Sequence, residues 1–127
     1  MIRSLFAASV PAALIIGAAA LFLWAMPVRA AECRPMKVSF YCCEHHGRAT
    51  ASGEIFNQNA MTAAMPNRSE LGRSYLVTHS GRSVVVRITD LGPHKRLNRV
   101  IDLSRGAFAK LAPTSKGVIS VCIERIR

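Results

Sequence analysis

Residues 81–93 of the chain read GRSVVVRITDLGP, and this stretch says the most about the fold. Valine and isoleucine recur at every second position, which is typical of a β-strand with one buried face and predicts a strand over Ser83–Thr89. Asp90 is expected to continue the buried side of this strand at its exit. Gly92-Pro93 then turns the chain sharply.

A second strand comes before this stretch. Tyr75–His79 is rich in β-forming residues, and Ser80-Gly81-Arg82 separates it from the next strand, so the two are predicted to form a hairpin. Other short strands are expected at Lys37–Tyr41, Met61–Ala64, Arg99–Leu103 and Val118–Arg125. One helix of at most two turns is expected at Ser104–Leu111, because Ser104 is a good N-cap and Pro113 follows. This pattern predicts a compact, all-β barrel.

The first 30 residues have the layout of a secretory signal peptide. Arg3 precedes an apolar run from Leu5 to Met26, and Val28-Arg29-Ala30 is a small-x-Ala cleavage site. Residues 1–30 are therefore predicted to be removed, leaving residues 31–127 as one exported domain, in the periplasm or cell envelope. The alternative is an uncleaved membrane anchor, because the apolar run is long enough to span a bilayer.

The chain is strongly basic. It has 17 Lys and Arg against 7 Asp and Glu, and its formal net charge of +10 falls to +8 once Arg3 and Arg29 leave with the signal peptide. In a cytosolic protein this charge would favour a nucleic-acid partner. An exported protein meets anionic wall polymers and lipids instead, so no nucleic acid is expected, and membrane contact is expected only through an uncleaved signal.

The cysteine count predicts two disulfides, because it is even and the domain is small and exported. The four cysteines are Cys33, Cys42, Cys43 and Cys122. A bridge between adjacent residues is strained, so Cys42 and Cys43 are each expected to pair elsewhere, one with Cys33 and the other with Cys122. His45 and His46 lie close enough in sequence to raise a metal site as the alternative. Their spacing matches no zinc pattern, so no metal ligand and no cofactor are expected.

Carboxylates are scarce, and three of them lie at turns or strand ends. Asp90 ends an apolar strand face, and a carboxyl group that is partly removed from water suits a general acid. The alternative is that Asp90 only caps its own turn. Asp102 is expected to accept backbone N–H groups at the start of the helix. Glu54 lies in a Ser-Gly-Glu turn, and the candidate sugar-binding residues near it are Thr50, Ser52 and Asn57.

The sequence has no nucleophile elbow, phosphate-binding loop or Cys–His pair with a third orienting group. The chemistry that it supports is carboxylate acid–base catalysis at a glycosidic bond. Hydrolysis usually needs two carboxylates that flank the bond. A lytic transglycosylase needs only one, which protonates the leaving oxygen and then takes the proton of the muramic C6 hydroxyl as a 1,6-anhydro ring closes.

Three segments, in this order, resemble the RlpA (rare lipoprotein A) family of lytic transglycosylases: GRATASGEIFNQNAMTAA, GRSVVVRITDLGP and RVIDLSRGAFAKL. The resemblance covers about Val38 to Ile126. It implies a six-stranded double-psi β-barrel, as in expansins and barwin-like proteins. It also implies cleavage of peptidoglycan glycan strands that lack stem peptides, with septal or cell-wall synthesis proteins as further partners.

The resemblance also implies roles for individual residues. The family's catalytic Asp falls on Asp90 and the Glu of its ASGE motif on Glu54, and the two are expected to meet across one wall of a sugar-binding groove. The Asp of the IDLS motif, which shapes the groove, falls on Asp102. Tyr41 matches the aromatic residue of the opening motif and is expected to contact the sugar.

The chain departs from the family pattern at Met65, where the family has His, at Leu91, where it has Arg, and at Cys42, where it has Gly. His94, which directly follows the DLGP turn, is the expected substitute for the missing imidazole and a candidate substrate contact, with His79 as the second choice. The alternative function is a non-catalytic, expansin-like module that binds the wall through the same groove. A disulfide-stapled secreted inhibitor or interaction protein is the third possibility.

Overall fold

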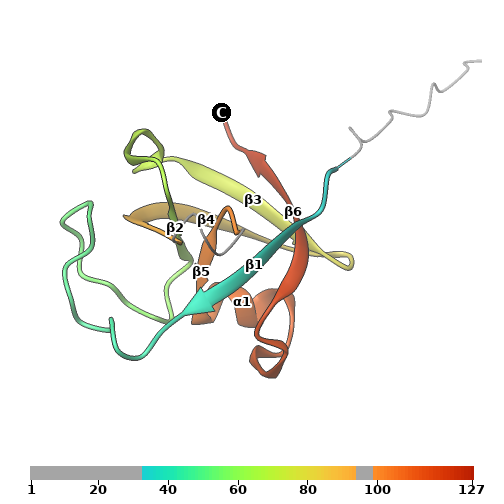
Figure 1. Cartoon of the computed structure of the whole chain (residues 1–127), viewed down its shortest axis with the longest axis horizontal. Coiled ribbons are helices and arrows are strands. Elements are labelled where there is room, and N and C mark those ends of the chain that lie inside the picture. Colours follow the sequence, from blue (N-terminus) through green and yellow to red (C-terminus); the bar gives the residue numbers. More distant parts are fainter. Residues whose placement is uncertain (1–32, 94–98) are drawn as a thin grey trace, which may run out of the picture.

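Six strands close into a barrel in the computed structural model, which describes residues 33–93 and 99–127 (Figure 1). The order around the barrel is β1-β5-β2-β4-β3-β6. The strands are β1 (Met36–Tyr41), β2 (Thr62–Met65), β3 (Ser74–His79), β4 (Arg82–Leu91), β5 (Asp102–Ser104) and β6 (Ile119–Arg125). The other elements are helix α1 (Arg105–Leu111) and the 3-10 turns η1 (Arg68–Glu70) and η3 (Thr114–Lys116). The prediction of a six-stranded barrel with one short helix is confirmed.

Two predictions fall outside the described residues. These are the signal peptide at residues 1–30 and the candidate substrate contact His94. The start of the domain at residue 31 therefore stays a prediction. Within residues 33–93 and 99–127, no helix is both long and apolar enough to span a membrane.

The predicted β3–β4 hairpin is confirmed, but its loop is one residue shorter than expected, because Arg82 is already part of β4. Its two loop residues, Ser80 and Gly81, have φ values of 45° and 78°. Left-handed backbone at both positions matches the twist of a two-residue hairpin. Pairing runs from His79↔Arg82 to Ser74↔Arg87, and β3 also pairs with β6 on its other side. The inward side chains of these strands, among them Val77 and Val86, are fully buried in the core.

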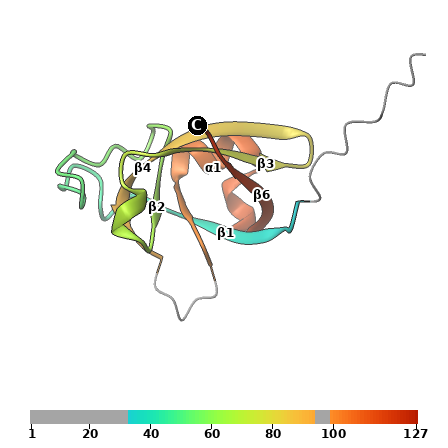
Figure 2. The same ribbon diagram turned by 90° about the horizontal axis from the view of Figure 1, so that it is seen from above.

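Helix α1 packs against β4, β5 and β1 (Figures 1 and 2). Ser104 is its N-cap, and the Ser104 hydroxyl accepts a hydrogen bond from the Ala107 N–H at 3.1 Å. The same hydroxyl donates to the Ala60 carbonyl at 2.5 Å. Phe108 is fully buried, and its ring centroid lies 4.8 Å from that of Phe40 on β1. The helix therefore joins the core to the loop before β2.

The parallel pairing of β2 and β4 contains a bulge, which decides the direction of Asp90. Ala63 pairs with Ile88, but the next residue, Ala64, pairs with Asp90, so Thr89 is an extra residue in β4. Because one inserted residue reverses the alternation of faces, Asp90 lies on the outer face, whereas Ile88 is buried in the core. The prediction that Asp90 continues the buried side of the strand is wrong for this reason.

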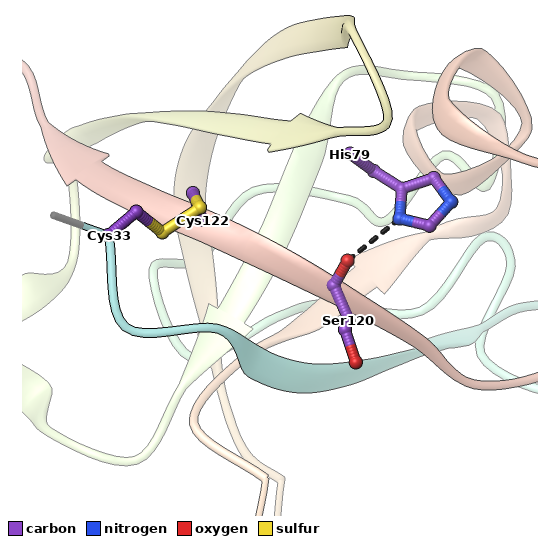
Figure 3. The surroundings of a disulfide bond; sticks show 4 residues. All are labelled: Cys33, His79, Ser120 and Cys122. Carbon is purple, nitrogen blue, oxygen red and sulfur yellow. Dashed lines mark hydrogen bonds between the residues drawn. A yellow bond between two sulfur atoms is a disulfide. The ribbon is translucent and has the colours of Figure 1, made fainter. Parts of the chain in front are cut away.

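All four cysteines form disulfides, as predicted, but both predicted pairings are wrong. The bridges are Cys33–Cys122, with Cα atoms 5.7 Å apart (Figure 3), and Cys42–Cys43, with Cα atoms 3.7 Å apart. Cys33 precedes β1 and meets Cys122 because β1 and β6 are antiparallel neighbours. Cys42 and Cys43 follow the other end of β1, and a six-residue strand spans about 20 Å. They therefore cannot reach Cys122 and pair with each other.

Candidate functional site

A row of four residues crosses four neighbouring strands. Ser39 on β1 pairs with Asp102 on β5, Asp102 pairs with Ala64 on β2, and Ala64 pairs with Asp90 on β4. Cross-strand partners face the same side of a sheet, and neighbouring strands are about 4.8 Å apart. The Cα atoms of Asp90 and Asp102 are therefore about 10 Å apart, with only the methyl group of Ala64 between the two carboxylates.

The two carboxylates share an open pocket of about 230 Å³. Its lining residues are Tyr41, His45, Ala64, Asp90, Leu91, Gly92, Pro93 and Asp102. Asp90 and Asp102 are both half-buried. Asp90 lies on β4 and Asp102 on β5, twelve positions apart in sequence, and Tyr41 lies on β1. Thus the structure brings together three of the residues that the sequence singled out.

A larger pocket of about 570 Å³ lies elsewhere, and Met36, Met65, Tyr75 and Arg99 are among its lining residues. Its one carboxylate, Glu70, accepts a hydrogen bond from the Tyr75 hydroxyl and pairs with Arg125 at 3.2 Å. A carboxylate with these partners is less available to a substrate than one that faces open space. The smaller pocket is therefore the candidate site, in spite of its size.

Asp90 is held by backbone N–H groups on one side of its carboxylate. Its Oδ1 atom accepts hydrogen bonds from the N–H of Leu91 at 2.8 Å and of Ala51 at 3.1 Å. The Ser52 N–H donates to the carbonyl of the bulged Thr89 at 3.0 Å, which docks the same turn on β4. Among the described residues, Oδ2 has no hydrogen-bond donor. Asp90 therefore caps its own turn with one oxygen, and its other oxygen has no partner in residues 33–93 and 99–127.

Glu54 has a different partner from the one expected. The Arg87 guanidinium donates two hydrogen bonds to its carboxylate, at 2.5 and 2.7 Å. These hydrogen bonds lower the pKa of the Glu54 carboxyl below its usual value. Glu54 does not line the pocket of Asp90, and no hydrogen bond joins the two acids. The ion pair and the Ala51–Asp90 bond instead fix one turn to β4 at two points.

The predicted sugar ligands near Glu54 are used within their own turns. The Thr50 hydroxyl donates to the Glu54 carbonyl at 2.7 Å and lies 2.9 Å from the Ser52 hydroxyl. The Asn57 side chain accepts a hydrogen bond from the Asn59 N–H at 2.9 Å. None of the three predicted ligands lines the pocket of Asp90. Their role in sugar binding stays a prediction, and their observed role is to shape the turns.

Tyr41 forms one wall of the pocket. Its ring stacks on Phe56 with centroids 4.5 Å apart and planes at 18°, and the His45 ring meets it edge-on at 5.8 Å. Its hydroxyl oxygen is buried and has no partner of good hydrogen-bond geometry, although the Thr89 hydroxyl lies near. Burial and the charges of Asp90 and Asp102 raise the pKa of the phenol well above its usual range. The phenol therefore stays a neutral donor.

Asp102 does not accept backbone N–H groups at the start of α1, which was the expectation. Ser104 caps that helix, and the Asp102 carboxylate accepts a hydrogen bond from the Ser39 hydroxyl across the β1–β5 pair. The reason is the direction of the side chain. In the sheet, Asp102 faces outward beside Ser39 and Ala64, toward the pocket.

Among the described residues, the imidazole at this pocket is His45, which the sequence raised only as a possible metal ligand. It is exposed, and its ring packs edge-on against Tyr41. The only signal in the sequence was its place four residues after Tyr41. His79 lies near the Cys33–Cys122 bridge, where its Nδ1 is 2.7 Å from the Ser120 carbonyl (Figure 3). His79 is therefore not the substitute imidazole.

No cluster of three or more His, Cys, Asp or Glu side chains with metal-binding geometry occurs in residues 33–93 and 99–127. His46, which raised the metal alternative, accepts a hydrogen bond from the Gln58 N–H on its Nδ1 at 3.2 Å.

Comparison of the sequence with known protein families gives a match that includes the candidate site. The sequence model of the family described as lytic transglycolase matches residues 36–123, which hold β1 to β5 and most of β6. The chain belongs to this family of RlpA-like lytic transglycosylase domains. The match begins with β1 and ends within β6, so the RlpA-like domain includes the whole row from Ser39 to Asp90.

Curated relatives of the RlpA-like domain carry the name that the motifs implied. A probable endolytic peptidoglycan transglycosylase RlpA of Synechocystis is 46% identical over 91 residues, which are 70% of this chain and 28% of the relative. The endolytic peptidoglycan transglycosylase RlpA of Campylobacter jejuni is 40% identical over 91 residues, 69% of this chain and 32% of the relative. The chain thus matches about a third or less of each of these relatives. An uncharacterized Synechocystis protein is 40% identical over 90 residues, 69% of this chain and 93% of its own length.

Solved structures confirm the double-psi barrel. The Streptomyces papain inhibitor has a TM-score of 0.62 and 27% identity over 76% of this chain and 96% of its own. The expansin of Clavibacter michiganensis has a TM-score of 0.60 and 20% identity over 73% of this chain and 50% of its own. The similarity to the expansin concerns the fold alone.

Proposed function

We propose that the RlpA-like domain is a lytic transglycosylase that cleaves the glycan strands of peptidoglycan, with Asp90 as both acid and base. The observation that carries the proposal is the row across the sheet. The Thr89 bulge turns Asp90 outward, and the sheet register sets it opposite Asp102 across Ala64, at an open pocket. The family match and the names of the relatives support the same activity.

In the proposed reaction, Asp90 gives its proton to the glycosidic oxygen as the bond from that oxygen to C1 of the muramic acid unit breaks. The C6 hydroxyl oxygen of the same unit then bonds to C1, and its proton passes to Asp90. The products are a free hydroxyl on one fragment and a 1,6-anhydro end on the other. No water is consumed, and the acid is regenerated. The Oδ2 atom, which has no donor among the described residues, is suited to this transfer.

Asp102 and Tyr41 have supporting roles in this proposal. Cleavage of a glycosidic bond passes through a transition state with positive charge on the sugar ring. The Asp102 side chain, oriented by Ser39, lies across the pocket from Asp90, where its carboxyl oxygens face the site of that charge. The Tyr41 ring lines the pocket, and its buried, neutral hydroxyl lies close to the Asp90 and Asp102 carboxylates, where it is a donor that supports the two acids.

The departures at Met65 and Leu91 are compatible with this proposal. Met65 is buried, and it lines the larger pocket on the opposite face of β2 from Ala64. Its side chain therefore takes no place beside Asp90 that an imidazole would need to fill. Leu91 is exposed at the rim of the Asp90 pocket, where it offers apolar contact in place of the family's Arg.

The cellular setting follows from the same features. Peptidoglycan lies outside the cytoplasm, and two disulfides persist in an oxidising compartment. We therefore place the domain outside the cytoplasm, in the periplasm or elsewhere in the envelope. Cell-wall synthesis or septal proteins are candidate partners by family membership.

The test is a product analysis in heavy-oxygen water. Purified protein is incubated with naked glycan strands, and the new ends are identified by mass spectrometry. The proposal expects 1,6-anhydro ends without heavy oxygen. Reducing muramic ends that carry the label would instead identify a hydrolase. Strand binding without any new ends would identify the non-catalytic, expansin-like module.

A further inference from the structure

A second depression of about 410 Å³ continues from the candidate active site. Its lining residues are Tyr41, Cys42, Cys43, Glu44 and His45. Tyr41 and His45 line both this depression and the pocket of Asp90. The two hollows are therefore adjacent across Tyr41 and His45, and together they reach from the end of β4 to the segment after β1; the pair is called the furrow below.

The wall of this second hollow is formed by the Cys42–Cys43 bridge and a well-ordered turn. The His45 N–H donates to the Cys42 carbonyl at 3.0 Å, and the Gly47 N–H donates to the Phe56 carbonyl at 2.9 Å. Phe56 in turn supports the ring of Tyr41. The turn is thus fixed on both sides of the disulfide, so the bridge presents a preformed apolar surface rather than a flexible one.

The Cys42–Cys43 bridge has little to contribute to stability. In the chain-entropy account, a disulfide stabilises a protein by closing a loop of the unfolded chain, and the effect grows with the length of the loop. The Cys33–Cys122 bridge closes a long loop, since its cysteines are 89 positions apart. Cys42 and Cys43 are neighbours in sequence, so their bridge closes almost no loop. Cys42 also stands where the family pattern has glycine, so the bridge is a departure from that pattern.

We infer that the Cys42–Cys43 bridge, with Tyr41, Glu44 and His45, forms a binding subsite for a saccharide unit of the glycan strand next to the unit at Asp90. This inference rests on the proposed function, since a polymer that is cut at Asp90 must extend along the furrow. A sugar ring has an apolar C–H face and a rim of hydroxyl groups. The polarizable sulfur atoms and the Tyr41 ring suit the face, and the Glu44 carboxylate accepts from the hydroxyls.

The first test compares the double variant Cys42→Ser/Cys43→Ser with the wild type on naked glycan strands of graded length. On long strands the variant is expected to raise KM about tenfold, the usual effect of losing one packed apolar contact, with kcat unchanged. On the shortest strands that are cut, KM is expected to stay the same. An equal change on short and long strands, or no change on either, would overturn the inference.

A second test does not depend on cleavage. In the Asp90→Asn variant, naked glycan strands are added and the NMR signals of the backbone amides are followed. The inference expects shifts at Cys43, Glu44 and His45, and no shifts at Cys33 and Cys122 at the other end of β1. Binding that shifts only Asp102 and its neighbours would refute the subsite, and so would the absence of any binding. If the wild type cuts nothing but these shifts occur, the subsite stands and the transglycosylase proposal fails.

Discussion

Tyr41 has a buried hydroxyl oxygen without a partner of good hydrogen-bond geometry among the described residues. Its hydroxyl oxygen is buried between two acids, and burial and both carboxylates raise the pKa of the phenol. Polar groups without a partner are rare in folded proteins and are commonly explained by function. Tyr75 offers the opposite case, because its hydroxyl donates to the Glu70 carboxylate.

Removing these two hydroxyl groups should therefore have opposite effects. Tyr41→Phe is expected to leave the free energy of unfolding almost unchanged, because no hydrogen bond within the protein is lost. It should lower kcat/KM on naked glycan about tenfold, the cost of losing the neutral donor beside the two carboxylates. Tyr75→Phe should leave kcat/KM unchanged and lower the free energy of unfolding by about 1 kcal/mol. Chemical denaturation and the cleavage assay measure both, and full activity in Tyr41→Phe would exclude a role of the hydroxyl in the reaction.

The Glu54–Arg87 ion pair gives a prediction about pH. Hydrogen bonds from Arg87 lower the pKa of Glu54 below its ordinary value of 4.5. The pair therefore stabilises the folded state at pH values above 4.5 and loses this contribution as the pH falls through the lower folded-state pKa. Glu54→Gln should lower the free energy of unfolding by about 0.5 kcal/mol at neutral pH, as for an exposed pair, and should have no effect in strong acid.

The control for this prediction is Glu124→Gln. Glu124 is exposed on β6 and has no ion pair among the described residues, so the same loss of charge should change stability little at either pH. An equal loss of stability in both variants at neutral pH would attribute the effect to net charge rather than to the Arg87 contact.

At the scale of elements, helix α1 is held by a close backbone contact. The Gly106 N–H donates to the Gln58 carbonyl at 2.8 Å. A Cβ atom on Gly106 would lie 2.6 Å from the Asn59 carbonyl oxygen and 2.9 Å from the Asn59 Cα. Both are backbone atoms, which cannot swing aside as a side chain can. The glycine is therefore required by the docking of the helix on the loop before β2.

Gly106→Ala should therefore destabilise the protein, against the helix propensity of alanine. In an open helix the change would stabilise by about 1 kcal/mol. Here the overlap with Asn59 is expected to lower the free energy of unfolding by about 2 kcal/mol, in the range for overpacked sites. The exposed Ala109 in the same helix is the control, because Ala109→Gly should cost only about 1 kcal/mol. A gain of stability in Gly106→Ala would contradict the contact.

The elements themselves could be predicted from the sequence, because alternation and turn residues are local signals. The β3–β4 hairpin and the α1 N-cap were predicted within one or two residues of their observed bounds. The Thr89 bulge could not be predicted, because it depends on the register between β2 and β4, which are far apart in sequence. The prediction that the Asp90 side chain lies on the buried side of β4 was therefore wrong, and the site lies on the outer face of the sheet instead.

At the scale of the whole molecule, the pairing of cysteines depends on the order of strands in the barrel. The sequence predicts that all four are bridged, but only the β1–β6 neighbourhood brings Cys33 to Cys122. His45 was missed for a similar reason, because its place at the pocket requires the ends of β1, β4 and β5 to meet. Asp90, Asp102 and Tyr41 could be predicted as site residues because the motifs that contain them are local features of the sequence.

The two bridges should differ in their effect on stability. Cys33→Ser/Cys122→Ser opens a separation of 89 residues and is expected to lower the free energy of unfolding by about 4 kcal/mol. Cys42→Ser/Cys43→Ser opens almost no loop and should lower it by less than about 1 kcal/mol. Urea denaturation of both double variants measures the difference. Equal losses would contradict the account of the second bridge as a binding surface.

The most direct measurement of the central claim is the rate at which Asp90→Asn forms 1,6-anhydro ends on naked glycan strands. Asparagine keeps the oxygen that accepts from Ala51 and Leu91, so the variant should fold with an unchanged thermal midpoint. Without an acid to donate and accept the proton, its rate is expected to fall at least about 100-fold. A folded Asp90→Asn variant that forms these ends at the wild-type rate would contradict the claim that this carboxylate does the chemistry.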